Sequence, residues 1–186
     1  MKNKAVFLDR DGVLNRAIVR DGKPYPPASL AEFEILPGTK EALDKLKVAG
    51  YLLIVVTNQP DVGRRTQQKS IVEEMHEVLR TALPLDEIYV CYHGYDGMCE
   101  CRKPQPGMLL AAAREFKIDL KKSFMIGDRS KDMEAGIAAG CKTIFIDYHY
   151  SEKLNIHPDL KTNSFELILK YIRKKNTFFK TQKFSD

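Results

Sequence analysis

Two aspartates stand one residue apart at the end of the first apolar run of the chain. The run Lys4–Leu8 leads directly into Asp9, and Asp11 and Gly12 follow. Two carboxylates this close repel each other unless a cation lies between them, and Mg²⁺ prefers oxygen ligands. With such a cation, one aspartate can act as a nucleophile toward phosphorus and the other as a general acid and base. A D-x-D-G segment also forms ordinary turns, so its chemistry depends on what accompanies it.

Three further polar clusters stand beside predicted strands or helices. In chain order they are Thr57-Asn58-Gln59, Arg102-Lys103, and Gly127-Asp128 with Asp132. Hydroxyls, backbone amides and cations can hold and neutralise phosphoryl oxygens. Asp128 suits a metal ligand, and Asp132, one helical turn later, suits an acceptor that orients a metal-bound water or Lys103. Each cluster alone has a simpler interpretation. Thr57-Asn58-Gln59 could be a turn, Arg102-Lys103 a pair of solvated cations, and Asp132 an acid favoured by the helix dipole.

A cysteine- and histidine-rich segment predicts a zinc site. Cys91 and His93 are followed, after five residues, by Cys99 and Cys101. Three cysteines and one histidine form a closed tetrahedral zinc site with no open position, so the predicted zinc is structural. A zinc loop over residues 91–101 would stiffen the segment that leads into Arg102-Lys103. The alternative is a chance cluster of reduced cysteines. Cys141 lies apart and is predicted to be a core residue.

Short apolar runs alternate with helical patterns along the chain. The predicted strands are Lys4–Leu8, Tyr51–Val56, Glu87–Cys91, Ser123–Ile126 and Thr143–Ile146. The predicted helices are Thr39–Val48, Thr66–Leu83, Pro106–Phe116, Lys131–Ala139, and a last helix capped by Asn163 or Ser164 that reaches Lys175. Apolar runs of this length suit strands buried on both faces. The alternation predicts an α/β fold with a parallel sheet, whose ligands bind at the carboxyl ends of the strands.

Length and charge place limits on the class of protein. The chain has 186 residues, of which 44% are hydrophobic and 30% charged, which predicts one soluble domain over residues 1–175. The net charge is +5, but six basic residues lie between Leu167 and Ser185, and the remainder holds 24 basic against 25 acidic residues. The basic segment 176–186 is therefore predicted to be a weakly ordered tail rather than a nucleic-acid-binding face. With no long apolar run and no signal-peptide core, we expect a cytoplasmic protein without a membrane partner.

The four polar clusters together resemble the motifs of the haloacid dehalogenase-like (HAD) phosphatases. The local sequences of these motifs are similar to those of the heptose bisphosphate phosphatases and the related histidinol-phosphate phosphatases. They read FLDRDGVLN, VVTNQ, CRKPQPGM and MIGDRSKDMEAGIAAG. The resemblance covers residues 4 to about 170, and the phrase C-R-K-P-x-P-G-M favours the heptose enzymes. The chain departs from the pattern of the heptose enzymes in three places. Pro60-Asp61 replaces the usual Ser-Gly, and Arg65 stands where the pattern often has glycine. Residues 16–30 differ from the sequence usual in these enzymes. These departures leave the sugar and its anomer open.

The resemblance implies a Rossmann-like three-layer sandwich of sheet order 3-2-1-4-5 without a large cap domain. It implies Asp9 as nucleophile, Asp11 as acid and base, Thr57 and Lys103 as phosphoryl-binding residues, and Mg²⁺ held by Asp9, the Asp11 carbonyl and Asp128. Residues expected to contact substrate are Asn58, Gln59, Arg102, Arg129, Arg16, Tyr25 and Arg64. The expected reaction of this monomer removes the 7-phosphate of D-glycero-D-manno-heptose 1,7-bisphosphate, in nucleotide-heptose synthesis for lipopolysaccharide or other surface polysaccharide. Histidinol phosphate or another small phosphomonoester is the alternative substrate, and a zinc-containing nucleic-acid-binding module is a distant alternative.

Overall fold

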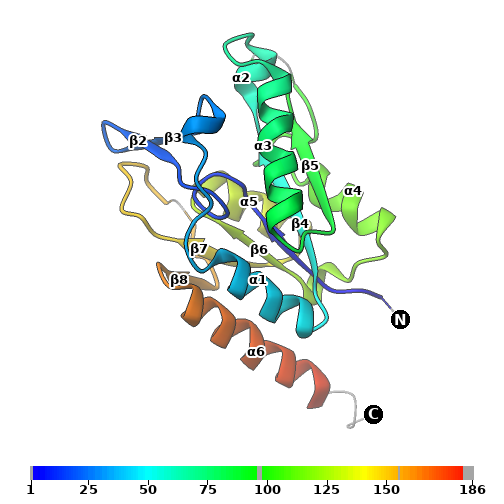
Figure 1. Cartoon of the computed structure of the whole chain (residues 1–186). Coiled ribbons are helices and arrows are strands. Elements are labelled where there is room, and N and C mark those ends of the chain that lie inside the picture. Colours follow the sequence, from blue (N-terminus) through cyan, green and yellow to red (C-terminus); the bar gives the residue numbers. More distant parts are fainter. Residues whose placement is uncertain (1, 96–97, 155, 182–186) are drawn as a thin grey trace.

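A six-stranded parallel sheet forms the centre of the computed structural model (Figure 1). The structure describes residues 2–95, 98–154 and 156–181. The strands, in their order across the sheet, are β5 (Glu87–Cys91), β4 (Leu52–Asn58), β1 (Ala5–Leu8), β6 (Phe124–Gly127), β7 (Lys142–Ile146) and β8 (Leu160–Thr162). All of these neighbouring pairs are parallel. The first five strands have the predicted order 3-2-1-4-5, and the α/β sandwich is confirmed.

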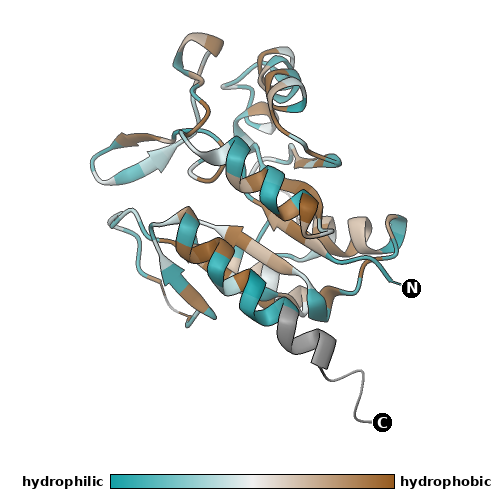
Figure 2. Cartoon of the chain, turned by 60° about the horizontal axis from the view of Figure 1, so that its bottom comes forward, coloured by the Kyte–Doolittle hydropathy of each residue, from teal (hydrophilic) through white to brown (hydrophobic). Residues whose placement is uncertain are grey.

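Apolar side chains alternate between the two faces of the sheet and build two cores. Val6 and Leu8 of β1 belong to one cluster and Ala5 and Phe7 to the other, and all four are fully buried. The first cluster includes residues of α1 (Thr39–Val48), α3 (Lys69–Ala82) and α6 (Phe165–Thr181), and the second those of α4 (Gly107–Glu115) and α5 (Ser130–Ala139). In Figure 2 the sheet is largely brown, while the helices alternate between brown and teal. Burial on both faces explains why the central strands are continuous apolar runs.

Smaller elements occupy the segments that the sequence pattern left without structure. They are the hairpin β2 (Ile18–Arg20) and β3 (Lys23–Tyr25), the short helix α2 (Pro60–Gly63), and the 3₁₀ turns η1 (Leu30–Glu32) and η2 (Leu120–Lys122). The edge strand β8 was also missed, because its three residues are not buried and form no apolar run. Between β1 and β4 the structure shows only the hairpin, one 3₁₀ turn and α1, so no large cap domain covers this side.

Two helix ends differ from the predicted positions by more than one residue. Helix α3 begins at Lys69 rather than Thr66, because the amides of Thr66 and Gln67 donate to the carbonyl of Asp61 in a turn. Helix α6 continues past the predicted end at Lys175 to Thr181. At this end Lys4 Nζ donates to Asn176 Oδ1 at 2.9 Å and ties the helix to the start of β1. The last residues of the predicted tail, 182–186, lie outside the described residues. No helix in the described ranges is long and apolar enough to cross a membrane.

Helix α6 packs one face against the first core and exposes the other, so truncating a side chain should cost more stability on the packed face. Ile172 is 1% exposed in the first core and Leu167 is 49% exposed. We expect Ile172→Ala to lower the free energy of unfolding by ~2–5 kcal/mol, because it leaves a cavity. The control Leu167→Ala should change it by less than ~1 kcal/mol. Urea unfolding curves of both variants check this, and equal losses would contradict the described docking of α6.

Candidate active site

The carboxyl ends of three adjacent strands bring the predicted polar clusters to one edge of the sheet. Leu8 of β1 pairs with Val55 of β4 and with Ile126 of β6, so the residues that follow in each strand meet at the same level. A cleft of about 260 Å³ opens there. Among the residues that line it are Asp9, Asp11, Lys103, Asp128 and Asp132. Segments separated by more than a hundred residues therefore share one polar site.

Lys103 is a buried cation of this site. Its side chain is 2% exposed, and its Nζ lies 2.8 Å from Asp9 Oδ1 and 2.5 Å from Asp132 Oδ1. Burial alone would lower the pKa of Lys103, but the charges of Asp132 and Asp9 outweigh this effect and raise it. The Asn58 amide fixes the loop: Asn58 Nδ2 donates to the Lys103 carbonyl at 2.9 Å, and the Lys103 amide donates to Asn58 Oδ1 at 3.0 Å. Lys103 therefore stays protonated and in place on an irregular segment.

Three carboxylates crowd around this single lysine. Oxygens of Asp9, Asp128 and Asp132 lie within 4.8 Å of one another. Burial and then the charge of Asp132 raise the pKa of Asp9 to about 7, although Lys103 acts in the opposite direction. The pKa of Asp128 is raised first by burial and then by the charges of Asp9 and Asp132. Such crowding is unfavourable for the ionised forms and favours a further cation.

Asp9 and Asp128 are the members of this group that fit a divalent cation. Both oxygens of Asp128 are buried and accept no hydrogen bond of standard geometry from the residues described. Asp132 is engaged instead, because one of its oxygens faces Lys103 and the other accepts from the Arg129 amide at 3.0 Å. Gly12, at φ +82°, makes the approach of Asp128 possible, since a Cβ there would lie 1.9 Å from Asp128 Oδ2. Buried, unpaired carboxylate oxygens are the donor set that Mg²⁺ prefers.

Asp11 is held by a fork of hydrogen bonds from its neighbour Arg10. Arg10 Nη2 contacts the two oxygens of Asp11 at 2.9 and 3.0 Å, and Arg10 Nε contacts both at 3.2 Å. Asn15 Nδ2 and Gln59 Nε2 each donate to Asp11 at 2.9 Å. Burial would raise the pKa of Asp11, but the charge of Arg10 and these hydrogen bonds outweigh it and lower the pKa. The side chain is therefore a tightly held carboxylate at the edge of the cleft.

Behind Arg10 lies His76, a buried residue that the sequence analysis missed. Arg10 and His76 are both fully buried, and Arg10 Nη1 lies 3.3 Å from His76 Nε2. Burial, followed by the Arg10 charge, lowers the pKa of His76 to about 4. The available signal was a single polar residue on the apolar stripe of α3, between Val72 and Leu79. That pattern shows that His76 is buried but does not show what it contacts.

The structure separates the predicted substrate contacts into three groups. Five of them line the cleft: Tyr25, Asn58, Arg64, Arg102 and Arg129. Gln59 is 3% exposed and its Nε2 donates to both Asp11 and Thr57 Oγ1, so it supports these two residues rather than facing substrate. Arg16 pairs with Glu34 at 2.7 Å and lines a different cavity beside Tyr148. The structure thus places Gln59 and Arg16 elsewhere than predicted, because their side chains have nearer partners.

Three cations surround the exposed Tyr95 at the cleft. The charged groups of Arg64 and Arg102 lie 5.5 Å from the ring centroid, and Lys131 Nζ lies 5.9 Å from it. Arg102 also donates to the backbone carbonyls of Gly94 and His93. Lys131 was not among the predicted contacts, since as the second residue of α5 it resembles an ordinary surface lysine. Asp61 pairs with Arg64 at 3.3 Å, so the cluster keeps an excess of positive charge beside the carboxylates.

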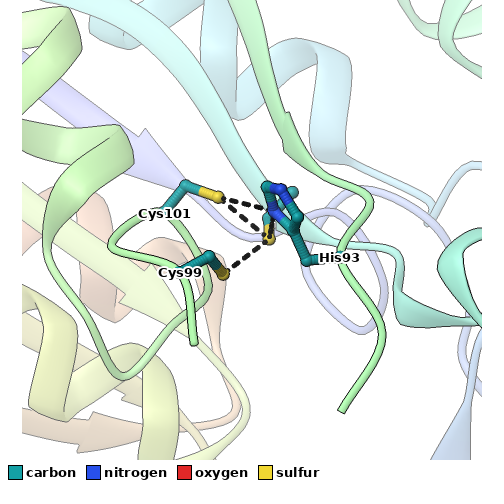
Figure 3. Close-up of side chains that lie close together, drawn as sticks. His93, Cys99 and Cys101 are labelled. Carbon is teal, nitrogen blue, oxygen red and sulfur yellow. Dashed lines mark hydrogen bonds between the residues drawn. The ribbon is translucent and has the colours of Figure 1, made fainter. Parts of the chain in front are cut away.

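The four predicted zinc ligands lie together before Arg102. Cys91 Sγ is 3.7 Å from Cys99 Sγ and 3.1 Å from Cys101 Sγ, and His93 Nδ1 is 3.4 and 3.2 Å from the sulfurs of Cys91 and Cys101 (Figure 3). These distances are too long for a disulfide. A tetrahedral zinc site with Zn–S bonds of about 2.3 Å has sulfur–sulfur edges of roughly 3.8 Å. The cluster therefore fits a four-coordinate zinc ion.

Comparison with known proteins agrees with this geometry. A family model described as HAD-hydrolase-like matches residues 100–163. The D-glycero-beta-D-manno-heptose-1,7-bisphosphate 7-phosphatase of Pasteurella multocida is 41% identical, over 75% of this chain and 78% of that protein. The chain belongs to the HAD-like heptose-bisphosphate phosphatase family. A family member from Burkholderia mallei, named for the alpha anomer, is 39% identical over 78% of this chain and 80% of its own length.

A solved structure of the same family has the same fold. It is the D,D-heptose 1,7-bisphosphate phosphatase of B. bronchiseptica complexed with magnesium and phosphate. Its TM-score is 0.76 at 26% identity, and the match covers 92% of this chain and 99% of that one. The match to this heptose-bisphosphate phosphatase thus extends over nearly the whole chain.

The cysteine and histidine cluster predicts a bound structural metal. Protein purified without added metal should contain about one zinc per chain by mass spectrometry. Cys99→Ser should lower zinc content and thermal stability together. The control Cys141→Ser changes a cysteine that is 8% exposed in the second core, so it should lower stability while zinc content is unchanged. Zinc-free wild-type protein with the same stability would contradict the assignment.

Burial of neutral His76 predicts a specific loss of stability in acid. Its pKa is about 4 in the folded protein and its ordinary value is 6.5. The stabilisation is therefore complete above pH 6.5 and is lost as the pH falls toward 4, because unfolding then takes up a proton. The free energy of unfolding of wild-type protein should fall by up to roughly 3 kcal/mol relative to His76→Gln over this range. Urea unfolding from pH 7 to 4.5 measures it, and parallel profiles would refute it.

Proposed function

We propose that this chain removes the 7-phosphate of D-glycero-D-manno-heptose 1,7-bisphosphate and thereby supplies nucleotide-heptose synthesis for surface polysaccharide. The relatives named for this reaction support the substrate. The observation that carries the chemistry is Asp9, which lies at the end of β1, 2.8 Å from the buried Lys103 and beside the unpaired carboxylate of Asp128. An anionic nucleophile, a fixed cation and a place for a second cation are what phosphoryl transfer needs.

The residues of the cleft support a two-step reaction. Asp9 Oδ attacks the phosphorus, the bond from phosphorus to the sugar oxygen breaks, and an aspartyl-phosphate forms. Asp11 gives a proton to the departing sugar oxygen. In the second step Asp11 takes a proton from water, which attacks the phosphorus and releases phosphate from Asp9. Thr57 and Lys103 neutralise the phosphoryl oxygens in both steps.

Mg²⁺ is the metal that we propose for this site. Asp9, Asp128 and the backbone carbonyl of Asp11 would hold it, with Asp132 keeping Lys103 in position. The metal would supply positive charge for the phosphoryl oxygens and reduce the repulsion among the carboxylates. Magnesium and phosphate are present in the related B. bronchiseptica structure. Zinc at the cysteine and histidine cluster would be structural, because all four positions are taken by the protein.

The cations around Tyr95 favour a bisphosphate over histidinol phosphate. Arg64, Arg102 and Lys131 line the cleft beyond the carboxylates, where the non-reacting end of a bound ester would lie. A second phosphate would be attracted to this region and bound by the guanidinium forks. The ammonium group of histidinol phosphate would be repelled from it. We therefore propose that the three cations bind the 1-phosphate.

The direct test is a comparison of substrates with Mg²⁺ present. The kcat/KM should be at least about a hundredfold higher for a heptose bisphosphate than for histidinol phosphate, because only the former fills the cationic region. Assays of the alpha and beta anomers would establish which one is preferred. Asp9→Asn should reduce turnover of every substrate by at least about 10⁴-fold while the fold is retained. Preference for histidinol phosphate, or an active Asp9→Asn protein, would overturn the proposal.

Adjacent residues Arg102 and Lys103 should have different roles. Lys103→Ala should lower kcat on every substrate, including p-nitrophenyl phosphate, because it removes charge from the transferring phosphoryl group. Arg102→Ala and Lys131→Met should lower kcat/KM for the bisphosphate by about ten- to a hundredfold and change aryl phosphate hydrolysis by less than about threefold. Lys131→Met is the cleaner variant, since Arg102 also holds the zinc loop backbone. Equal losses on both substrates would refute this division.

A further inference from the structure

A chain of polar contacts, fully buried at Arg10 and His76, runs from Asp11 away from the cleft. Arg10 joins Asp11 to His76, and His76 Nδ1 lies 3.4 Å from Glu73 Oε2. The Tyr92 hydroxyl donates to the other oxygen of Glu73 at 2.5 Å. Arg10 belongs to the loop after β1, His76 and Glu73 to α3, and Tyr92 to the segment between two predicted zinc ligands. The chain thus joins three separate parts of the fold behind Asp11.

Because the Arg10 guanidinium can only donate hydrogen bonds, its contact with His76 indicates which ring nitrogen carries the proton. A guanidinium carries only donors, so a hydrogen bond between Arg10 Nη1 and His76 Nε2 requires Nε2 to accept. The remaining proton of the neutral ring then lies on Nδ1 and points to Glu73. The lowered pKa of His76, caused first by burial and then by the Arg10 charge, agrees with a neutral ring. The Arg10 guanidinium carbon, Cζ, also lies over the Phe33 ring, 5.9 Å from the ring centroid.

We propose that His76 is a positioning residue for Asp11, acting through the guanidinium plane of Arg10. This role rests on the proposed phosphatase activity, because it concerns the proton that Asp11 gives to the leaving oxygen. Arg10 Nε and Nη2 both face Asp11, and Nη1 is the group that His76 holds. With Nη1 anchored, the planar fork cannot turn away from the carboxylate. Asp11 then has one orientation at the edge of the cleft.

Loss of the acceptor at position 76 has a defined consequence. Arg10 is fully buried, so an unpaired Nη1–H would be costly and the guanidinium would turn toward another acceptor. Asp11 would keep its contacts to Asn15 and Gln59 but lose the geometry of the fork. Proton transfer to the leaving oxygen depends on this geometry, whereas attack by Asp9 does not. The defect should therefore appear with poor leaving groups and be small with activated ones.

The test measures kcat/KM for a series of phosphate esters from an alkyl phosphate to p-nitrophenyl phosphate. This constant covers the steps up to bond cleavage and excludes hydrolysis of the aspartyl-phosphate. His76→Leu should lose about ten- to a hundredfold on the alkyl ester and less than about threefold on the aryl ester, so that the rate depends more steeply on the leaving group. His76→Gln, whose carbonyl oxygen can accept from Arg10, should restore most of the activity on the alkyl ester.

Two further variants separate positioning from stability. Leu79→Ala changes a fully buried core residue of the same helix, and should lower thermal stability without altering the dependence on the leaving group. Arg10→Lys keeps the charge but not the fork, and should reproduce the pattern of His76→Leu even where the latter does not fold. Equal losses on all esters, no rescue by Gln, or no change in a folded His76→Leu protein would each overturn the role. A wild-type protein inactive on every ester would instead refute the proposed phosphatase.

Discussion

The buried ammonium of Lys103 is the charge on which the arrangement of the cleft depends. It lies between Asp9 and Asp132, in a place where either carboxylate alone would be strongly destabilised by the loss of water. Parallel strands make this place, because their carboxyl ends meet at one edge and expose loops there rather than regular structure. Burial first, and then repulsion among three aspartates that one lysine does not balance, raise the pKa values of Asp9 and Asp128. Asp128, whose oxygens accept no hydrogen bond of standard geometry from the described residues, is therefore one of the groups that we propose hold a further cation.

Keeping a lysine fixed on an irregular segment requires support from several elements. Asn58, at the end of β4, holds both backbone polar groups of Lys103, its N–H and its C=O. The cysteine and histidine cluster closes the loop immediately before it, and Gly63 of α2 packs so closely on this loop that a Cβ would lie 2.3 Å from the Tyr92 carbonyl. These contacts explain how the cation that we propose for the phosphoryl group can come from a loop, because the loop is held on both sides of Arg102-Lys103. A fixed donor needs little reorganisation during the reaction.

Asp11 is supported in a different way, by a charged fork and not by a metal or a lysine. Arg10, Asn15 and Gln59 surround it and keep its pKa low in the absence of ligand. In the proposed mechanism this ionised form is the base for hydrolysis of the aspartyl-phosphate, and an approaching anionic substrate would raise the pKa of Asp11 so that it could carry the proton for the first step. The two aspartates of the D-x-D motif thus have opposite environments. Asp9 is crowded by like charges, whereas Asp11 is neutralised by a buried guanidinium. These environments suit the roles that we propose, with Asp9 as a nucleophile beside a metal and Asp11 as the acid and base.

Local sequence alone determined the strand-end positions of Asp9, Thr57 and Asp128. A short run that is apolar throughout is typical of a strand buried on both faces of a parallel sheet. The residue that follows such a strand lies at the carboxyl edge of the sheet. The spacing of the cysteines and His93 likewise limited the possible ligands to one compact set. The edge strand β8 and the hairpin β2–β3 were missed because short, partly exposed strands have no clear hydrophobic period.

Only the tertiary structure decided the partners of side chains from separate elements. Gln59 supports Asp11 and Thr57, Arg16 pairs with Glu34, and Arg10 meets His76 across 66 positions of sequence. Such contacts depend on how far apart two elements lie and how they are oriented after packing. Neither property produces a periodic pattern in the sequence. The types of the chemical groups could therefore be inferred from the residues themselves. Which of them face the substrate, and which hold the others in place, was decided by how the strands and helices pack.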